Sequence, residues 1–79
     1  MVYVIVGGEK VSRLHDGVYC RIMDMRDGKW NHCRWGKVKS ATIFSSFEEA
    51  QAVIRNAREW AECVTARVAA IHPLNISCT

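Results

Sequence analysis

The chain has 79 residues and a mass of 9.0 kDa, which allows one domain and leaves only a thin core. Hydrophobic residues make up 49% and charged residues 24%, a composition typical of a folded globular protein and not of a disordered one. No apolar run approaches the roughly 20 residues of a membrane-spanning helix, so we expect no membrane partner.

Positive charge is concentrated in one part of the chain. The formal net charge is +3, but residues 10–39 carry eight basic and three acidic residues, a net of +5, whereas residues 40–79 have a net charge of −1. Such a segment is typical of a protein that binds nucleic acid or an acidic protein surface. It can also be a solvated face that serves solubility.

The four cysteines are dispersed and form no CxxC motif. The first apolar run, Val2–Val6, is too short for a secretory signal, so we expect reduced thiols and a cytoplasmic location, that of a bacterial host. His32 and Cys33 are adjacent, and neighbours in a strand point to opposite faces. We therefore expect neither a metal site nor a cofactor.

The N-terminal segment predicts a central strand and a short edge strand. Val2–Val6 is β-branched and apolar on both faces, which favours a central strand ending at Gly7-Gly8. Lys10–Leu14 is interpreted as a short edge strand.

Residues 18–35 predict a β-hairpin. Strand-like segments at Val18–Met25 and Lys29–Trp35 flank Asp27-Gly28, a pair typical of a two-residue turn. Such a turn fixes the register. The expected pairs are Met25–Trp30, Asp24–Asn31, Met23–His32, Ile22–Cys33, Arg21–Arg34 and Cys20–Trp35.

This register gives the hairpin one apolar face and one mixed face. The apolar face, which we assign to the core, holds Val18, Cys20, Ile22, Cys33 and Trp35. The mixed face holds Tyr19, Arg21, Met23, Met25, Trp30, His32 and Arg34.

A helix and a last strand follow the connection at residues 36–43. Ser46 with Glu49, or Ser45 with Glu48, fits a capping box, and apolar residues at helical spacing run to near Glu62. Phe47 and Trp60 are expected in the core. Residues 64–71 alternate as a strand with one buried face, and Pro73 ends it.

These elements predict an α+β fold. A small, mainly antiparallel sheet of three or four strands carries one α-helix on one face, in the order β-β-β-α-β. Residues 1–72 form the domain and residues 73–79 a tail. One helix covers only one face of the sheet, so the other is left to water or to a partner.

No catalytic constellation is predicted. Asp24, His32 and Cys33 could suggest a nucleophile and base, but His32 and Cys33 point to opposite faces, so the base cannot reach the thiol. We therefore expect a protein that is not an enzyme.

The mixed face is the candidate binding surface. Exposed aromatic and arginine side chains can stack bases and hold phosphates, and the same residue types anchor protein interfaces. The face could also pack within the monomer or close a homodimer. The expected contact residues are Tyr19, Arg21, Trp30, His32, Arg34 and Lys37.

A resemblance follows from several short segments taken together. Tyr3–Val6 opens the chain, Trp35 precedes Ser40-Ala41, and Phe44-Ser45-Ser46 leads to Glu48-Glu49-Ala50 before a valine-rich last strand. This pattern resembles small proteins encoded by bacteriophages and prophages, in which such a run joins a strand to a single helix. Many of those proteins, anti-CRISPR proteins among them, are non-enzymatic inhibitors of host machinery.

The resemblance implies an inhibitor that binds a host protein or ribonucleoprotein complex by steric occlusion, with the mixed face as the contact surface. The alternative is a small nucleic-acid-binding regulator that uses the same face.

Overall fold

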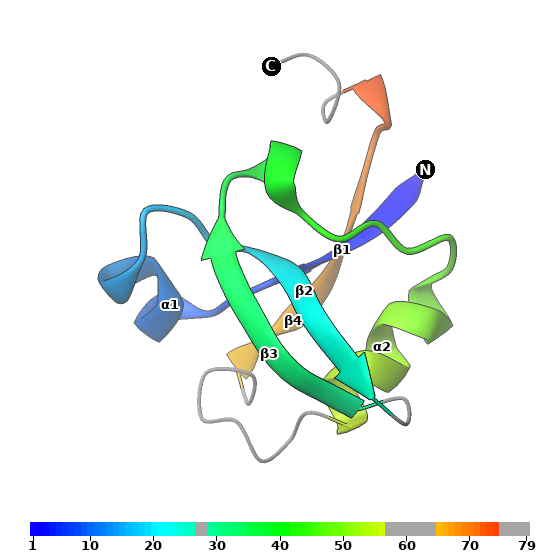
Figure 1. The fold of residues 1–79 in the computed structure, drawn as a ribbon. Helices are drawn as coiled ribbons and strands as arrows, with labels where there is room; N and C mark the ends of the chain where they lie inside the picture. Colours follow the sequence, from blue (N-terminus) through cyan, green and yellow to red (C-terminus); the bar gives the residue numbers. More distant parts are fainter. Residues whose placement is uncertain (27–28, 57–64, 75–79) are drawn as a thin grey trace.

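A computed structural model describes residues 1–26, 29–56 and 65–74, with the backbone alone for residues 24–26 and 29–32. The fold is α+β, as predicted: a four-stranded antiparallel sheet in the order β3-β2-β1-β4, with one main helix (Figure 1). The elements are β1 (Val2–Val6), α1 (Glu9–Leu14), β2 (Tyr19–Arg26), β3 (Lys29–Gly36), the 3₁₀ helix η1 (Val38–Ser40), α2 (Phe47–Asn56) and β4 (Arg67–Ile71).

Strand β1 is central, which confirms the prediction from its two apolar faces. It pairs along its whole length with β4, from Val2 opposite Ile71 to Val6 opposite Arg67. Val4 and Ile5 point to opposite faces of the sheet, and both are fully buried. The last strand is shorter than predicted, because the ladder with β1 begins only at Arg67.

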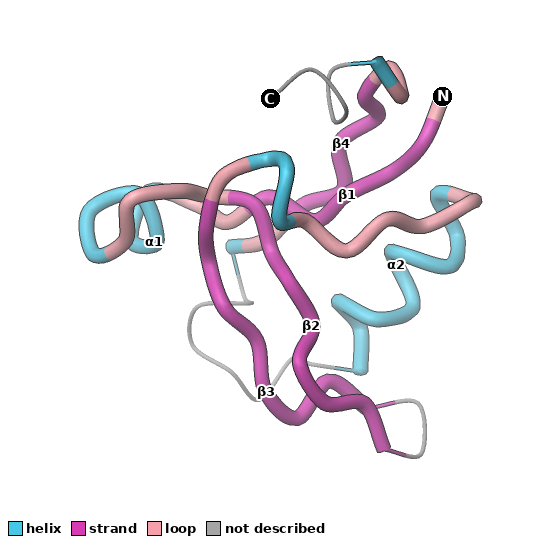
Figure 2. Tube along the Cα trace, turned by 45° about the horizontal axis from the view of Figure 1, so that its top comes forward, coloured by secondary structure: helices cyan, strands magenta, loops and turns pink. Residues whose placement is uncertain are grey.

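The sheet splays between β1 and β2, and a loop segment fills the gap. The two strands pair only at Val6 and Tyr19. Beyond that point Phe44 exchanges two backbone hydrogen bonds with Tyr3, of 2.8 and 3.0 Å, and Thr42 bonds to β2. The hairpin therefore extends away from the β1–β4 pair (Figure 2). Residues 36–43 were predicted only as a connection, so this pairing was not expected.

Helix α2 packs on one face of the sheet and begins at the predicted cap. The Glu49 N–H donates to Ser46 Oγ at 3.2 Å, and the Glu49 carboxylate accepts from Ser45 Oγ at 3.0 Å. Ala50 and Val53 are buried in the core with Ile5, Cys20 and Trp35, joined by Val11 and Phe44. Trp60 and the predicted helix end near Glu62 lie outside the described residues.

Phe47 was wrongly predicted as a core residue, since 47% of it is exposed. It is the first residue of α2, at the rim of the sheet, where its ring meets Tyr3 edge-to-face with centroids 6.3 Å apart. Helical spacing placed Phe47 on the apolar side of the helix but could not show how much of its ring the sheet covers.

Residues 9–14 form helix α1, so the edge strand predicted at Lys10–Leu14 is wrong. The Ser12 N–H donates to the Gly8 carbonyl at 3.1 Å, and Arg13 pairs with Glu9 one turn earlier. Val11 alone in α1 is buried, close against Gly7. A helix of one to two turns is unstable in isolation, so tertiary packing of Val11 decides the conformation here.

The hairpin register is confirmed at its base and corrected near its tip. Cys20–Trp35, Arg21–Arg34, Ile22–Cys33 and Met25–Trp30 pair as expected, and Arg26 opposite Lys29 confirms a two-residue connection. Residues 27–28 themselves lie outside the described residues.

The predicted pairs Asp24–Asn31 and Met23–His32 are wrong, because Asp24 lies opposite His32. The register shifts on either side of Asp24, by one extra residue first on β2 and then on β3. The two shifts cancel, which is why pairs counted from the turn agree again at the base.

The face of the sheet opposite α2 is only partly open. Directly opposite residues share a face, so Val6 and Tyr19 lie on the same side as Val4. Val4 and Val6 are buried, so the monomer itself covers this end. The predicted free second face is therefore wrong for β1, whereas Arg21, Met23 and Arg34 are exposed among the described side chains of the hairpin.

Candidate binding face on the hairpin

The hairpin separates its side chains as the sequence predicts. Cys20 and Trp35 are buried, and Ile22 and Cys33 pack against the same core. Arg21, Met23 and Arg34 are exposed, and Tyr19 is half-buried. We call Tyr19, Arg21, Met23 and Arg34 the hairpin face.

Three further residues were predicted as contacts. Trp30 and His32 lie in β3, but their side chains are outside the described part of the structure. Lys37 is exposed and follows β3 directly, where its carbonyl accepts the Ser40 N–H at 3.0 Å. Among the predicted contacts, the described side chains brought together across the strands are Arg21 and Arg34.

Arg21 and Arg34 form a pair of like charges. They are directly opposite in the antiparallel ladder, a position that holds Cβ atoms about 5 Å apart. Within the described part of the chain an ion pair joins Arg13 to Glu9, and none involves Arg21 or Arg34. Two exposed arginines on neighbouring strands concentrate positive charge at this point of the hairpin, so the arrangement favours an external anion.

The backbone at Arg21 is fixed from the side away from β3. The Cys20 carbonyl accepts the Thr42 N–H at 2.9 Å, and the Ile22 N–H donates to Thr42 Oγ1 at 2.7 Å. With β3 on its other edge, β2 is held on both sides at this point. The Arg21 side chain thus projects from a rigid base, although its guanidinium group is free to adjust.

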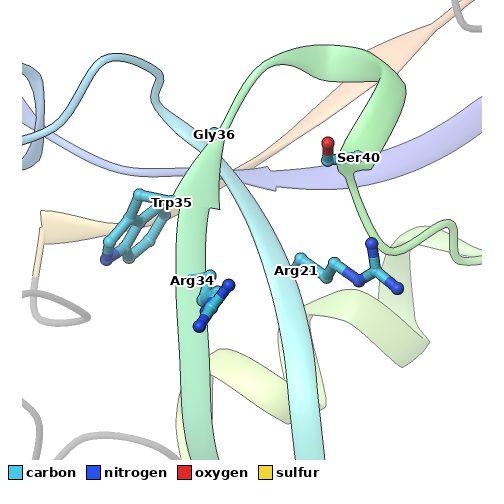
Figure 3. Close-up of a pocket in the computed structure, with 5 residues that line it drawn as sticks. All are labelled: Arg21, Arg34, Trp35, Gly36 and Ser40. Carbon is cyan, nitrogen blue, oxygen red and sulfur yellow. The ribbon is translucent and has the colours of Figure 1, made fainter.

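A pocket of about 160 Å³ lies at the base of the hairpin, lined by Arg21, Arg34, Trp35, Gly36 and Ser40. Figure 3 shows Arg21 extending from β2 beside the chain that leaves Ser40, with Arg34 on the neighbouring strand and the Trp35 ring on the other side of β3. The pocket is about five times the roughly 30 Å³ that one water occupies in the liquid. We call it the arginine pocket.

Gly36 and Ser40 were not predicted as site residues. The predicted pairs stopped at Cys20–Trp35, and one further step places Gly36 opposite Tyr19. That step would have shown an arginine face ending at a residue without a side chain. The position of Ser40 depends on η1, which no sequence pattern indicated.

Gly17 packs closely against the end of β3. A Cβ on Gly17 would collide with the backbone carbonyl of Gly36. This close approach of two backbones explains why the position needs glycine. It also holds the base of the hairpin against the loop that precedes β2.

Metal ligands, cysteines and helix length were compared within residues 1–26, 29–56 and 65–74. No group of three metal-ligating side chains occurs there. Cys20 and Cys33 are unbridged. None of the helices in these ranges has the length and apolar character to cross a membrane.

Comparisons with protein-family models, curated proteins and solved structures find no match to this chain. The geometry and charge of the hairpin therefore support the function proposed below.

Proposed function

We propose that this protein is a non-enzymatic binding protein whose hairpin face docks on an acidic surface of a partner protein. The observation that supports this most directly is the pair formed by Arg21 and Arg34, exposed, directly opposite and without a carboxylate partner in the described part of the chain. Arginine is enriched at protein interfaces and binds carboxylates through its planar fork of donors.

An apolar contact accompanies the charges. Met23 is 48% exposed, two residues from Arg21 along β2. Methionine is enriched at interfaces and adapts its shape to a partner. The basic excess of residues 10–39 would speed association with an acidic surface.

The resemblance to small phage proteins adds the proposed biological role. A rigid hairpin on a small domain can block a partner's working surface without chemistry of its own. We therefore propose inhibition of a host protein or ribonucleoprotein complex by steric occlusion, in the bacterial cytoplasm.

The test is capture of partners from bacterial lysate on immobilised protein. Arg55 lies on α2, the helix that covers the opposite face of the sheet. The wild type and Arg55→Gln should therefore retain the same host protein. The double variant Arg21→Gln/Arg34→Gln should lose it. Retention of the same protein by the double variant, or no retained protein with the wild type, would contradict the proposal.

Nucleic-acid binding is the second candidate, supported by the same arginine pair and by the basic segment. Its signature is salt dependence, because neutralising phosphates releases counterions and log affinity falls linearly with log salt. Electrophoretic mobility shifts measured across salt concentrations would show it. No shift at low salt would eliminate it.

A further inference from the structure

The arginine pocket has the features of a small-anion site, distinct from a broad docking surface. Two cationic forks from neighbouring strands and one hydroxyl line a hollow of about 160 Å³. We propose that the arginine pocket binds the phosphate group of a phosphomonoester, held by the guanidinium groups of Arg21 and Arg34 and the hydroxyl of Ser40.

The donor set fits phosphate better than carboxylate. One guanidinium group satisfies a planar carboxylate with two parallel hydrogen bonds, so a second arginine on the other strand would be left over. A phosphomonoester presents three acceptor oxygens in a tetrahedral arrangement and carries a charge of about −1.5 to −2 at pH 7. Figure 3 shows the Arg21 guanidinium turned away from Arg34, so both arginine side chains would turn toward a bound phosphate. With the Ser40 hydroxyl they can then supply several donors and two positive charges to it.

The pocket walls are held independently of a ligand. Thr42 ties β2 on both sides of Arg21, at Cys20 and Ile22. Ser40 ends a 3₁₀ turn closed by hydrogen bonds from the Ser40 and Ala41 N–H groups to Lys37 and Val38, of 3.0 and 3.1 Å. Binding would therefore order mainly the two arginine side chains, which keeps the entropic cost low.

A substitution at Gly36 can fill the pocket without removing either arginine. A Cβ at Gly36 would have only one neighbour within 4 Å, the Cβ of Ser40 at 4.0 Å, so a side chain can be added without a clash. That side chain would project toward Ser40 and narrow the pocket. Gly36→Val therefore removes space for phosphate while both arginines remain.

This separation also distinguishes the pocket from the protein interface proposed above. The pocket uses two arginines of the hairpin face but needs no macromolecular partner. Gly36→Val should weaken phosphate binding tenfold or more and leave capture of an acidic partner largely unchanged. Phosphate binding and partner capture are therefore measured separately.

The experiment is a titration of ¹⁵N-labelled protein with inorganic phosphate, followed by amide chemical shifts and compared with chloride at equal ionic strength. We expect shifts concentrated at Arg21, Arg34, Gly36 and Ser40 in the wild type. Arg34→Gln and Gly36→Val should each weaken binding tenfold or more, and Arg55→Gln should bind as the wild type does. If Gly36→Val does not fold, Ser40→Ala replaces it in the test. We expect Ser40→Ala to lower the affinity for phosphate by about threefold to tenfold.

Three outcomes would overturn the proposal. The first is equal shifts with chloride, and the second is phosphate binding unaffected by Arg34→Gln and by Gly36→Val or Ser40→Ala. The third uses oligonucleotides with and without a 5′ phosphate: equal affinity for both would show that the phosphodiester backbone is the ligand. A sugar phosphate that binds as inorganic phosphate does would support a small-molecule source, and preference for the 5′-phosphorylated oligonucleotide would support a chain terminus.

Discussion

The two faces of the β2–β3 hairpin are built from alternate residues of the same strands, yet one is buried and the other is exposed. On one face Cys20 and Trp35 are buried and contribute to the core beneath α2. On the other face Arg21 and Arg34, one residue along each strand, are exposed and carry like charges. The core face stabilises the fold, whereas like charges directly opposite in a ladder are unfavourable.

This difference means that stability and binding can be changed separately. Burial of apolar area is the dominant favourable contribution to folding, so changes on the core face act on the whole domain. Exposed side chains contribute little to stability, so changes at Arg21 or Arg34 act on whatever the face binds. Three substitutions test the comparison.

The largest effect is expected from Trp35→Ala on the core face. Removing a buried indole costs about 3–5 kcal/mol, through lost burial and the cavity that remains. A chain of this size has little stability to spare, so we expect a largely unfolded protein. Urea unfolding followed by circular dichroism measures it. A loss below about 1 kcal/mol would show that Trp35 does not belong to the core.

A smaller loss of stability is expected from Thr42→Val, a change in the segment that is hydrogen-bonded to β2. The change keeps the shape but removes the acceptor of the Ile22 N–H, and an unsatisfied buried donor costs about 1–3 kcal/mol. Exchange of the Ile22 amide proton should accelerate. Thr42→Ser is the matched control, since it keeps the hydroxyl and should keep that proton protected. Equal protection in Thr42→Val and Thr42→Ser would contradict the bridging role of this segment.

The smallest change in stability is expected from Arg34→Glu, which should stabilise the protein. The change turns a cross-strand repulsion into an attraction, which should raise the free energy of unfolding by about 0.2–1 kcal/mol at low salt. Added salt should reduce the gain because the pair is exposed. The same variant should lose the bound partner. A destabilised protein would contradict the pairing of Arg21 with Arg34.

Local signals in the sequence predicted the hairpin, the central strand and the start of α2. Asp27-Gly28 between two strand-like segments gave the register at the base, and Ser46 with Glu49 gave the helix cap that the structure confirms. Both features depend on residues close together in the chain, so their chemistry is visible in the sequence.

Features that depend on distant packing were not predictable in the same way. Val11 alone is buried in α1, and no local pattern distinguishes six helical residues from a short strand. The paired register shifts around Asp24 leave the ends of the ladder unchanged, so counting from the turn could not detect them. Ser40 enters the arginine pocket only because Thr42 fastens the following chain to β2.

Both proposals require that Arg21 lies opposite Arg34 with Cys20 and Ile22 facing the core. Cys20 and Ile22 direct their backbone groups toward Thr42 and away from β3, so Cys20–Trp35 and Ile22–Cys33 are the pairs without mutual hydrogen bonds, with Cα atoms about 4.5 Å apart.

A nuclear Overhauser experiment on the Hα protons tests this register directly. Strong cross-peaks between Cys20 and Trp35 and between Ile22 and Cys33 are the predicted result. A strong cross-peak from Cys20 to Arg34 or to Gly36 would show a one-residue slip, which would turn the arginines toward the opposite face and contradict the account.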